Sequence, residues 1–281
     1  MTGLPVLLDG IGFGEGPRWH DGRLWFSDFH AHAVSSVGDD GHRRTELELD
    51  EPPSGLGWLP DGRLLVVAMV SRRLLRVEGD GRVVSHADLS SVATGRCNDM
   101  VVASDGTAYV GNFGFDFEVG EPRRAAALAH VTPDGIVSVA AEGFEFPNGS
   151  VITPDGRTLV VGETMAQRVT AFTIDDDGSL RERRLWAELG EVMPDGCTLD
   201  AEGAIWFADA RSSVLVRVRE GGAIVDRVDA GQRAFACALG GDEGRTLFVL
   251  CADGAGDLDG DRPPTGTLRT HRVDVPHAGR P

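Results

Sequence analysis

The segment DGRLLVVAM, residues 61–69, begins with an acidic residue and a glycine and continues into a run of apolar side chains. An acidic-Gly pair between apolar runs is a strong hairpin signal, because glycine readily adopts the positive φ that tight turns require. The phrase occurs six times, at steps of 40 to 50 residues. Its copies read DGRLWFSD (21–28), DGRLLVVAM (61–69), DGTAYVGNF (105–113), DGRTLVVGET (155–164), EGAIWFADA (202–210) and EGRTLFVLC (243–251).

A second series of acidic-Gly pairs lies between these copies and implies that each repeat holds about four strands. These pairs are at 40–41, 80–81, 134–135, 177–178 and 220–221. Sustained helical periodicity is nearly absent, and a step of 40 to 50 residues is typical of a propeller blade. We therefore expect an all-β fold, a six-bladed β-propeller with four-stranded blades.

The two ends of the chain offer a way to close the ring. The segment LPVLLD (4–9) can pair with TGTLRTHRVDV (265–275), which would leave few exposed strand edges. No linker or shift of composition indicates a second domain, so residues 1–281 are expected to form a single propeller domain. The tail, residues 276–281, is expected to fray.

Composition limits the chemistry and the partners. The chain has 281 residues and a net charge of -17, and all 27 of its basic residues are arginine. Catalysis by a lysine Schiff base or a phosphate-loop lysine is therefore excluded. The negative charge argues against nucleic acid as a partner, because nucleic-acid binding draws on cationic side chains. Chemistry must come from carboxylates, amides, histidines or a metal ion.

Cysteine spacing and the N-terminal sequence indicate the compartment. Four cysteines occur without a CxxC pair, which favours reduced thiols in a cytoplasmic protein. The first residues lack a basic leader followed by a long apolar run, and no run of eighteen apolar residues occurs. We therefore expect a cytoplasmic protein with no membrane span.

The repeat predicts which residues meet at the propeller axis, since the innermost strand of each blade lines the central channel. The equivalent positions, six or seven residues before each turn of the first series, are Glu15, Ser54, Asn98, Asn148, Asp195 and Ala236. Four of them carry strong oxygen donors, which would repel one another or remain unsatisfied unless a cation or ordered water took their lone pairs. Oxygen ligands favour Ca²⁺, with Zn²⁺, Mg²⁺ and Mn²⁺ as alternatives. Capping of local backbone by these side chains is the competing interpretation.

Four phrases in these positions resemble those of the SMP-30/gluconolactonase/LRE family. They are GEGPRW (14–19), RCNDMVVASDG (96–106), FPNGSVITPDGRTLVVGET (146–164) and MPDGCTLDAEGAIWFADA (193–210). The resemblance covers nearly the whole chain. It implies a six-bladed propeller with one divalent ion near its axis and hydrolysis of sugar lactones or related lactones.

The resemblance also assigns roles to residues. It implies that Glu15, Asn148 and Asp195 hold the metal ion and that Asp195 also serves as general base. It places Arg96 and Asn98 in contact with substrate. Asp99 reads as a structural partner of the site.

One segment departs from the sugar-lactonase pattern, GNFGFDFEVGEPRR at 111–124. Asp116 falls near a substrate-contacting glutamate of the family. Phe113, Phe115 and Phe117 make the segment more apolar, which would suit a less polar or aromatic lactone or ester if their rings line the pocket. Packing between blades is an equally good interpretation of these aromatics.

These features predict a metal-dependent lactonase or carboxylic ester hydrolase, in which the ion polarises the carbonyl and Asp195 takes a proton from water. The alternative is a non-enzymatic, calcium-binding propeller that serves as a ligand- or protein-binding module. A strictosidine-synthase-like condensing propeller ranks last, because its base would not require this ligand set.

Other candidates have structural interpretations. His20, His30 and His32 are expected at the surface or in packing, and Asp257, Asp259 and Asp261 in an exposed connection, since the loop lacks a distal glutamate. Glu163 and Arg168 resemble positions of the family and could equally form an ion pair between blades, and both interpretations stay open.

Overall fold

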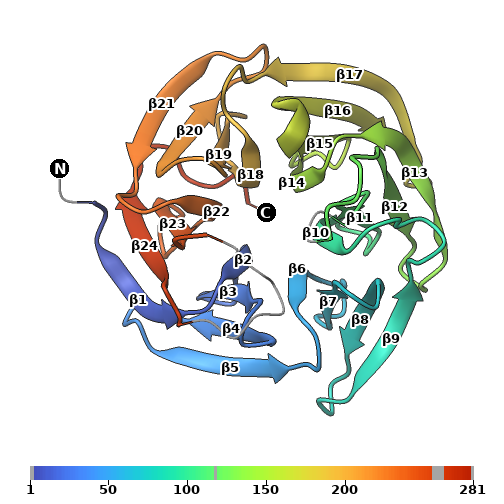
Figure 1. Ribbon diagram of the computed structural model, residues 1–281, viewed down its shortest axis with the longest axis horizontal. Coiled ribbons are helices and arrows are strands. Elements are labelled where there is room, and N and C mark those ends of the chain that lie inside the picture. Colours follow the sequence, from blue (N-terminus) through green and yellow to red (C-terminus); the bar gives the residue numbers. More distant parts are fainter. Residues whose placement is uncertain (1–2, 117–118, 255–262, 280–281) are drawn as a thin grey trace.

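The computed structural model describes residues 3–116, 119–254 and 263–279 as a ring of six antiparallel sheets around one axis (Figure 1). Each sheet has four strands, and five of the sheets use four strands that are consecutive along the chain. The prediction of a six-bladed propeller with four-stranded blades is confirmed.

The strands of the first three blades follow one another from the axis outward (Figure 1). The first blade comprises β2 (Gly14–His20), β3 (Arg23–Asp28), β4 (Ala33–Val37) and β5 (Arg43–Glu48). The second comprises β6 (Pro53–Trp58), β7 (Leu64–Ala68), β8 (Arg73–Val77) and β9 (Val83–Asp88). The third comprises β10 (Cys97–Val102), β11 (Ala108–Asn112), β12 (Ala126–Val131) and β13 (Val137–Phe144).

The next two blades repeat this order, and the last one contains both ends of the chain. The fourth blade comprises β14 (Pro147–Ile152), β15 (Thr158–Glu163), β16 (Arg168–Ile174) and β17 (Leu180–Glu188), with a short 3-10 helix, η1 (Thr164–Ala166), after β15. The fifth comprises β18 (Pro194–Leu199), β19 (Ile205–Asp209), β20 (Val214–Val218) and β21 (Ile224–Asp229). The sixth comprises β22 (Ala234–Gly240), β23 (Thr246–Cys251), β24 (Gly266–Arg272) and β1 (Val6–Ile11).

The turn at Asp61 and Gly62 shows why the repeated phrase makes hairpins. Gly62 has a φ of 85°, a conformation that side chains with a Cβ rarely adopt, and it joins β6 to β7. The Asp61 carboxylate accepts a hydrogen bond of 3.1 Å from the backbone N–H of Arg63. An Asp-Gly turn therefore supplies both the left-handed residue and a side chain that fixes the start of the next strand.

The hydrophobic core lies between neighbouring blades. Between the second and third blades, Leu65 and Val67 of β7 share one buried cluster with Met100 of β10 and Val110 of β11. Both Leu65 and Met100 are fully buried. Because each seam is made by two blades, the packing that stabilises the ring also fixes the angle between them.

The ring closes as predicted, because β1 pairs antiparallel with β24 from the other end of the chain. The described part of the tail, residues 276–279, contacts the fifth blade. The Pro276 carbonyl accepts a hydrogen bond from the N–H of Ala201, and the Ala278 N–H donates to the carbonyl of Leu199. The fifth blade thus satisfies backbone groups of these residues.

Two further observations concern the cysteines and the helix content. All four cysteines are buried and none forms a disulfide, as their spacing predicted. Within the described ranges, no helix has the length and apolar character needed to cross a membrane.

Candidate active site

An irregularity recurs in the innermost strand of every blade at the residues aligned by the repeat. The pairing of β2 with β3 shifts register between Glu15 and Arg18, and that of β18 with β19 shifts between Pro194 and Cys197. Equivalent shifts occur in β6, β10, β14 and β22. A bulge turns a side chain away from the normal alternation of a strand. The repeated position is therefore structurally distinct in all six blades.

The glycine that follows the aligned residue brings neighbouring blades into close contact. A Cβ at Gly149 would lie 2.5 Å from the backbone oxygen of Asp195, and a Cβ at Gly196 would lie 2.5 Å from the Cβ of Ala236. Similarly, a Cβ at Gly16 would lie 3.0 Å from the backbone oxygen of Ser54. Each of these glycines thus packs against the aligned residue of the next blade. This places the aligned residues side by side around the axis.

Glu15, Asn148 and Asp195 form a buried cluster from three different blades. Their exposed fractions are 8%, 5% and 6%. The Asn148 amide donates a hydrogen bond to the Asp195 carboxylate, and its Nδ2 also donates to the Thr164 hydroxyl at 3.1 Å. Thr164 in turn donates to the Pro194 carbonyl at 2.7 Å, next to Asp195. Because the amide nitrogen of Asn148 donates its hydrogens to Asp195 and Thr164, its Oδ1 is the atom that could bind a metal ion.

The two carboxylates destabilise each other in their charged forms. Burial, followed by the negative charges of Asp195 and Asp99, raises the pKa of Glu15 well above its usual range. Burial, with the charge of Asp99, raises the pKa of Asp195 to about 7, although the hydrogen bond from Asn148 opposes the shift. Such a pair requires either protons or a cation.

The donor set fits a hard divalent cation. Two carboxylates and one amide oxygen are ligand types that Ca²⁺ prefers. A bound cation would also offset the electrostatic repulsion between the two carboxylates. The described residues contain no group of three His, Cys, Asp or Glu side chains suited to a metal. The amide of Asn148 is consequently needed to complete a three-residue set.

Asp99 is engaged in structural contacts, in agreement with its sequence interpretation. Its Oδ1 lies 2.8 Å from an Arg18 terminal nitrogen and accepts a bond of 2.9 Å from the backbone N–H of Met100. Arg18 also donates to the carbonyl oxygens of Met100 and Pro17. Arg18 lies within GEGPRW, but its sequence neighbours do not indicate its partner Asp99. The positive charge of Arg18 lowers the pKa of Glu15 and so partly offsets the increase caused by burial.

The structure places the predicted substrate residues Arg96 and Asn98 at the start of β10. Asn98 is 6% exposed, and its Nδ2 donates a 3.3 Å hydrogen bond to the Pro147 carbonyl, next to Asn148. Arg96 is half-buried, and its carbonyl accepts a bond from the N–H of Phe113. Asn98 thus lies in the ring order that the repeat predicted, adjacent to the buried cluster.

Aromatic side chains gather at the end of the ring where the innermost strands begin. We call this cluster the aromatic collar; its members are Phe13, Phe29, Met69, Phe113, Phe146, Phe235 and Ala252. Phe113 stacks on Phe146 with 4.5 Å between ring centroids, and Phe13 meets Phe235 edge-on at 4.7 Å. Phe13 is two residues from Glu15, so the collar adjoins the buried cluster.

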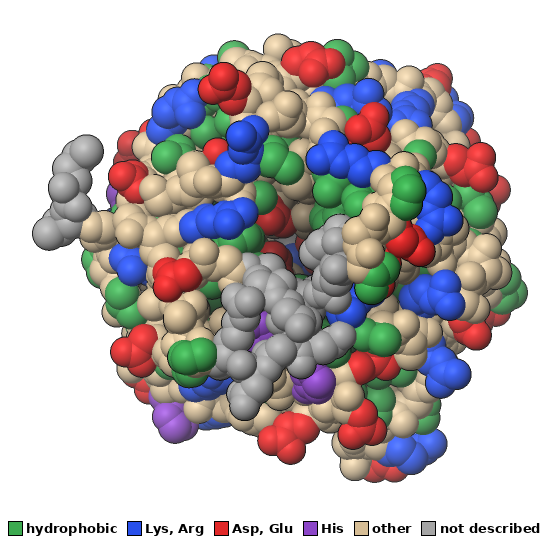
Figure 2. Space-filling model, viewed as in Figure 1, with side chains coloured by type: hydrophobic (Ala, Val, Ile, Leu, Met, Phe, Trp, Pro, Cys, Tyr) green, Lys and Arg blue, Asp and Glu red, His purple; other side chains and the backbone are tan. Residues whose placement is uncertain are grey.

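The contacts of Phe113 agree with packing between blades, because its buried ring stacks on Phe146 at the start of the next blade. Phe115 is 4% exposed, and Phe117 lies outside the described residues. Asp116 is half-buried, and its carboxylate accepts a 3.3 Å hydrogen bond from the N–H of Val119, within its own loop. Seen along the axis, acidic side chains are visible within the hollow at the centre of this face (Figure 2).

Glu163 and Arg168 form an ion pair, but within the fourth blade rather than between blades. The Glu163 side chain is fully buried, and both of its oxygens accept hydrogen bonds of 2.9 Å from Arg168. Thr170 and the backbone N–H of Glu145 also donate to it. This pair joins β15 to β16 and has a structural role.

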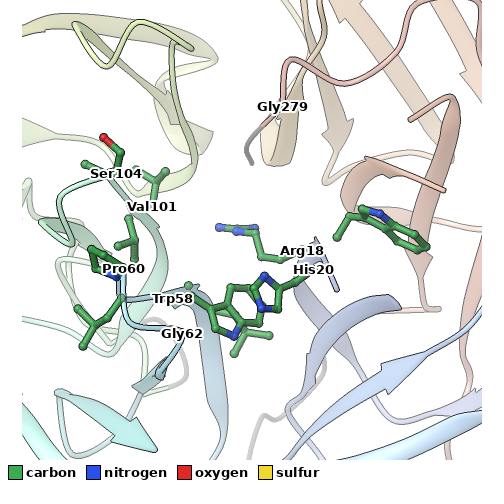
Figure 3. Close-up of a pocket in the computed structure, with 14 residues that line it drawn as sticks. Arg18, His20, Trp58, Pro60, Gly62, Val101, Ser104 and Gly279 are labelled. Carbon is green, nitrogen blue, oxygen red and sulfur yellow. The ribbon is translucent and has the colours of Figure 1, made fainter. Parts of the chain in front are cut away.

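His20 lies at the other end of β2 from Glu15. Its ring stacks on Trp58 at 3.9 Å, beside a pocket of about 450 Å³ that Arg18 and Gly279 also line (Figure 3). This packing position agrees with the sequence interpretation. The acidic loop with Asp257, Asp259 and Asp261 lies outside the described residues.

The fold and the buried cluster define a six-bladed propeller with a polar, oxygen-rich axial site. The chain belongs to the SMP-30/Gluconolactonase/LRE-like family, which it matches over residues 13–253.

Individual relatives align over nearly their full lengths. The chain is 29% identical to pentonolactonase XacC of Haloferax volcanii, over 100% of this chain and 97% of the relative. It is 23% identical to 6-deoxy-6-sulfogluconolactonase of Pseudomonas putida, over 95% and 94% of the two chains. The crystal structure of regucalcin from Agrobacterium tumefaciens, described as a calcium-binding protein, has a TM-score of 0.81 at 22% identity and covers 99% of this chain and 95% of that chain.

Proposed function

We propose that this protein is a divalent-metal-dependent lactonase that opens a lactone or related cyclic ester to a hydroxy acid. The observation that carries the proposal is the meeting of Glu15, Asn148 and Asp195, from three blades, in one buried cluster. The lactonase names of two relatives that align over nearly their full lengths support it. We infer a cytoplasmic location from the cysteine content alone.

Glu15, Asn148 and Asp195 would hold the cation, for which we propose Ca²⁺. When bound, a divalent ion supplies polarisation of the lactone carbonyl, which contributes several kcal/mol to the stabilisation of a transition state. The oxygen-only donor set and the calcium-binding relative support this choice of ion.

Asp195 is the proposed general base. Its carboxylate would accept a proton from water as the water oxygen attacks the carbonyl carbon. The ring C–O bond then breaks, and the departing ring oxygen takes up that proton to give an acid and an alcohol. The hydrogen bond from Asn148 holds the carboxylate in one orientation. A positioned base of this kind accelerates hydrolysis by about 10²- to 10⁴-fold.

Arg96 and Asn98 are proposed to orient the lactone, since both lie where β10 begins, next to the cluster. Asp116, Phe113 and Phe115 follow β11 and are proposed to form one wall of the substrate site. The buried rings of the aromatic collar give this wall an apolar surface, against which one face of a lactone ring can pack.

Hydrolysis of a lactone panel, measured by release of acid, tests the proposal. The panel contains D-glucono-1,5-lactone, a pentono-1,4-lactone and an aryl-substituted γ-lactone. We expect hydrolysis that is lost after chelation, restored by Ca²⁺, and reduced at least 100-fold in Asp195→Asn. Hydrolysis that survives both chelation and Asp195→Asn would reject the metal-dependent mechanism. If no lactone of the panel is hydrolysed, the proposed lactonase activity is rejected.

A further inference from the structure

One arginine at the rim of the candidate site has no part in the roles described so far. Arg233 immediately precedes β22, the innermost strand of the sixth blade. The axial position of this blade is occupied by Ala236, so the sixth blade contributes no oxygen ligand to the cluster. At this end of the ring, the sixth blade instead places a charged side chain, Arg233, and an aromatic one, Phe235.

Two contacts fix the direction of the Arg233 side chain. Its Nε donates a hydrogen bond of 2.6 Å to the carbonyl of Ala210, at the end of β19. Its guanidinium carbon lies 4.9 Å from the centroid of the Phe235 ring. Since Phe235 packs edge-on against Phe13, the arginine packs against the aromatic collar. A guanidinium held at Nε and stacked on a ring is pre-organised, so it loses little freedom when it binds a ligand.

The Arg233 guanidinium lies beside the aromatic collar and forms no ion pair with a described carboxylate. The residue is exposed, and no ion pair joins it to an acidic side chain among residues 3–116, 119–254 and 263–279. Within those ranges its two terminal nitrogens donate to no acceptor.

We propose that Arg233 is a specificity-determining residue that binds a terminal oxyanion of the substrate, on the part of the molecule away from the scissile ester. The substrate class is then a lactone with a second anionic group, such as a carboxylate or a phosphate. The paired terminal nitrogens of arginine match the geometry of both groups. This inference rests on the proposed function, because it assigns the substrate of that same site.

A substrate-binding role and a structural role for Arg233 make different predictions. A substrate-binding arginine would pair with an anion at the far end of the substrate, so its removal would weaken anionic substrates more than neutral ones. A purely structural arginine would stabilise the carboxylates equally, whatever the substrate. The two roles therefore differ in how a variant changes discrimination between neutral and anionic substrates.

The test compares matched substrates in the full-length protein loaded with Ca²⁺. D-Glucono-1,4-lactone and D-glucaro-1,4-lactone share one ring and differ in whether the far end is a hydroxymethyl or a carboxylate. We expect the wild type to have the higher kcat/KM on the glucarolactone. In Arg233→Gln the ratio of the two kcat/KM values falls roughly 10- to 100-fold, and Arg233→Lys retains part of it. Arg227→Gln, which removes an exposed arginine from β21, leaves the ratio unchanged.

Calorimetry with open-chain acids makes the result independent of turnover. Gluconate, glucarate and 6-phosphogluconate are titrated into the wild type and Arg233→Gln. Tighter binding of glucarate than of gluconate, lost in the variant, supports a carboxylate; the same pattern with 6-phosphogluconate alone supports a phosphate. A ratio of affinities that Arg233→Gln leaves unaltered, or binding of none of the three acids, overturns the inference. Absence of hydrolysis with this binding pattern intact would instead reject the proposed lactonase and leave the anion site standing.

Discussion

The Asn148 amide donates a hydrogen bond to the Asp195 carboxylate across the seam between the fourth and fifth blades. The two residues are far apart along the chain, and each occupies the bulged position of its innermost strand. Their contact shows how a repeat builds a site: identical local geometry in each blade directs one side chain toward a shared axis. Different side chains at that position then give the site its chemistry.

Replacement of Asn148 should affect metal binding, whereas replacement of Asn98 should affect substrate binding. In Asn148→Ala the cation loses an oxygen ligand and Asp195 loses its donor, so we expect a loss in Ca²⁺ affinity of about 10- to 100-fold. Asn98→Ala removes an amide from the neighbouring blade, and we expect a raised KM with Ca²⁺ affinity retained. Calorimetric titration and steady-state kinetics check this pair. Equal effects of the two substitutions on Ca²⁺ affinity would contradict the assignment.

The ion pair of Arg18 and Asp99 should make a large contribution to stability. Their side chains are 3% and 5% exposed, so removal of one partner leaves an uncompensated buried charge. We expect Arg18→Met to lower the free energy of unfolding by about 3–5 kcal/mol, measured by chemical denaturation. The double variant with Asp99→Leu should recover part of this loss. A loss below about 1 kcal/mol would show that the pair has little importance.

Phe113 should influence both folding and substrate choice. Its ring is buried and stacks on Phe146, so Phe113→Ala is expected to cost about 3–5 kcal/mol of unfolding free energy. Phe113→Leu preserves most of the packing and tests the wall of the site. In Phe113→Leu we expect KM to increase more for aryl-substituted lactones than for unsubstituted lactones of the same ring size. Identical changes for both substrates would place Phe113 in packing alone.

Glu163 should make the stability of the protein sensitive to acid. Burial favours its neutral form, but hydrogen bonds from Arg168 and Thr170 outweigh burial and lower its pKa. A carboxylate with a lowered pKa in the folded state stabilises the protein above its unfolded pKa, and this stability is lost as the pH falls through the folded pKa. Denaturation of metal-free protein at several pH values from about 7 to 3 should show a smaller decrease for Glu163→Gln than for the wild type. Parallel curves would contradict this account.

The fold was predictable because its signal is local and repeated. Each acidic-Gly pair specifies a hairpin by itself, as Gly62 illustrates, and six copies indicate the number of blades. The candidate ligands could be aligned for the same reason, since Glu15 and Asp195 occupy one repeat position.

Long-range partners could not be predicted in this way. Whether Arg18 is buried depends on Asp99, 81 residues later, and whether Arg233 is held at the rim depends on the carbonyl of Ala210. Neither arginine has a neighbour in the sequence that indicates these partners. The contacts of residues 276–279 with the fifth blade could not be predicted either, because they are made by backbone groups, which have no pattern of side chains.

Calorimetric titration of Ca²⁺ into the metal-free protein tests the shared cation site most directly. The account predicts one bound ion per chain in the wild type and no detectable binding in Glu15→Gln or Asp195→Asn, each still folded by circular dichroism. Binding of one ion with undiminished affinity in both variants would contradict it.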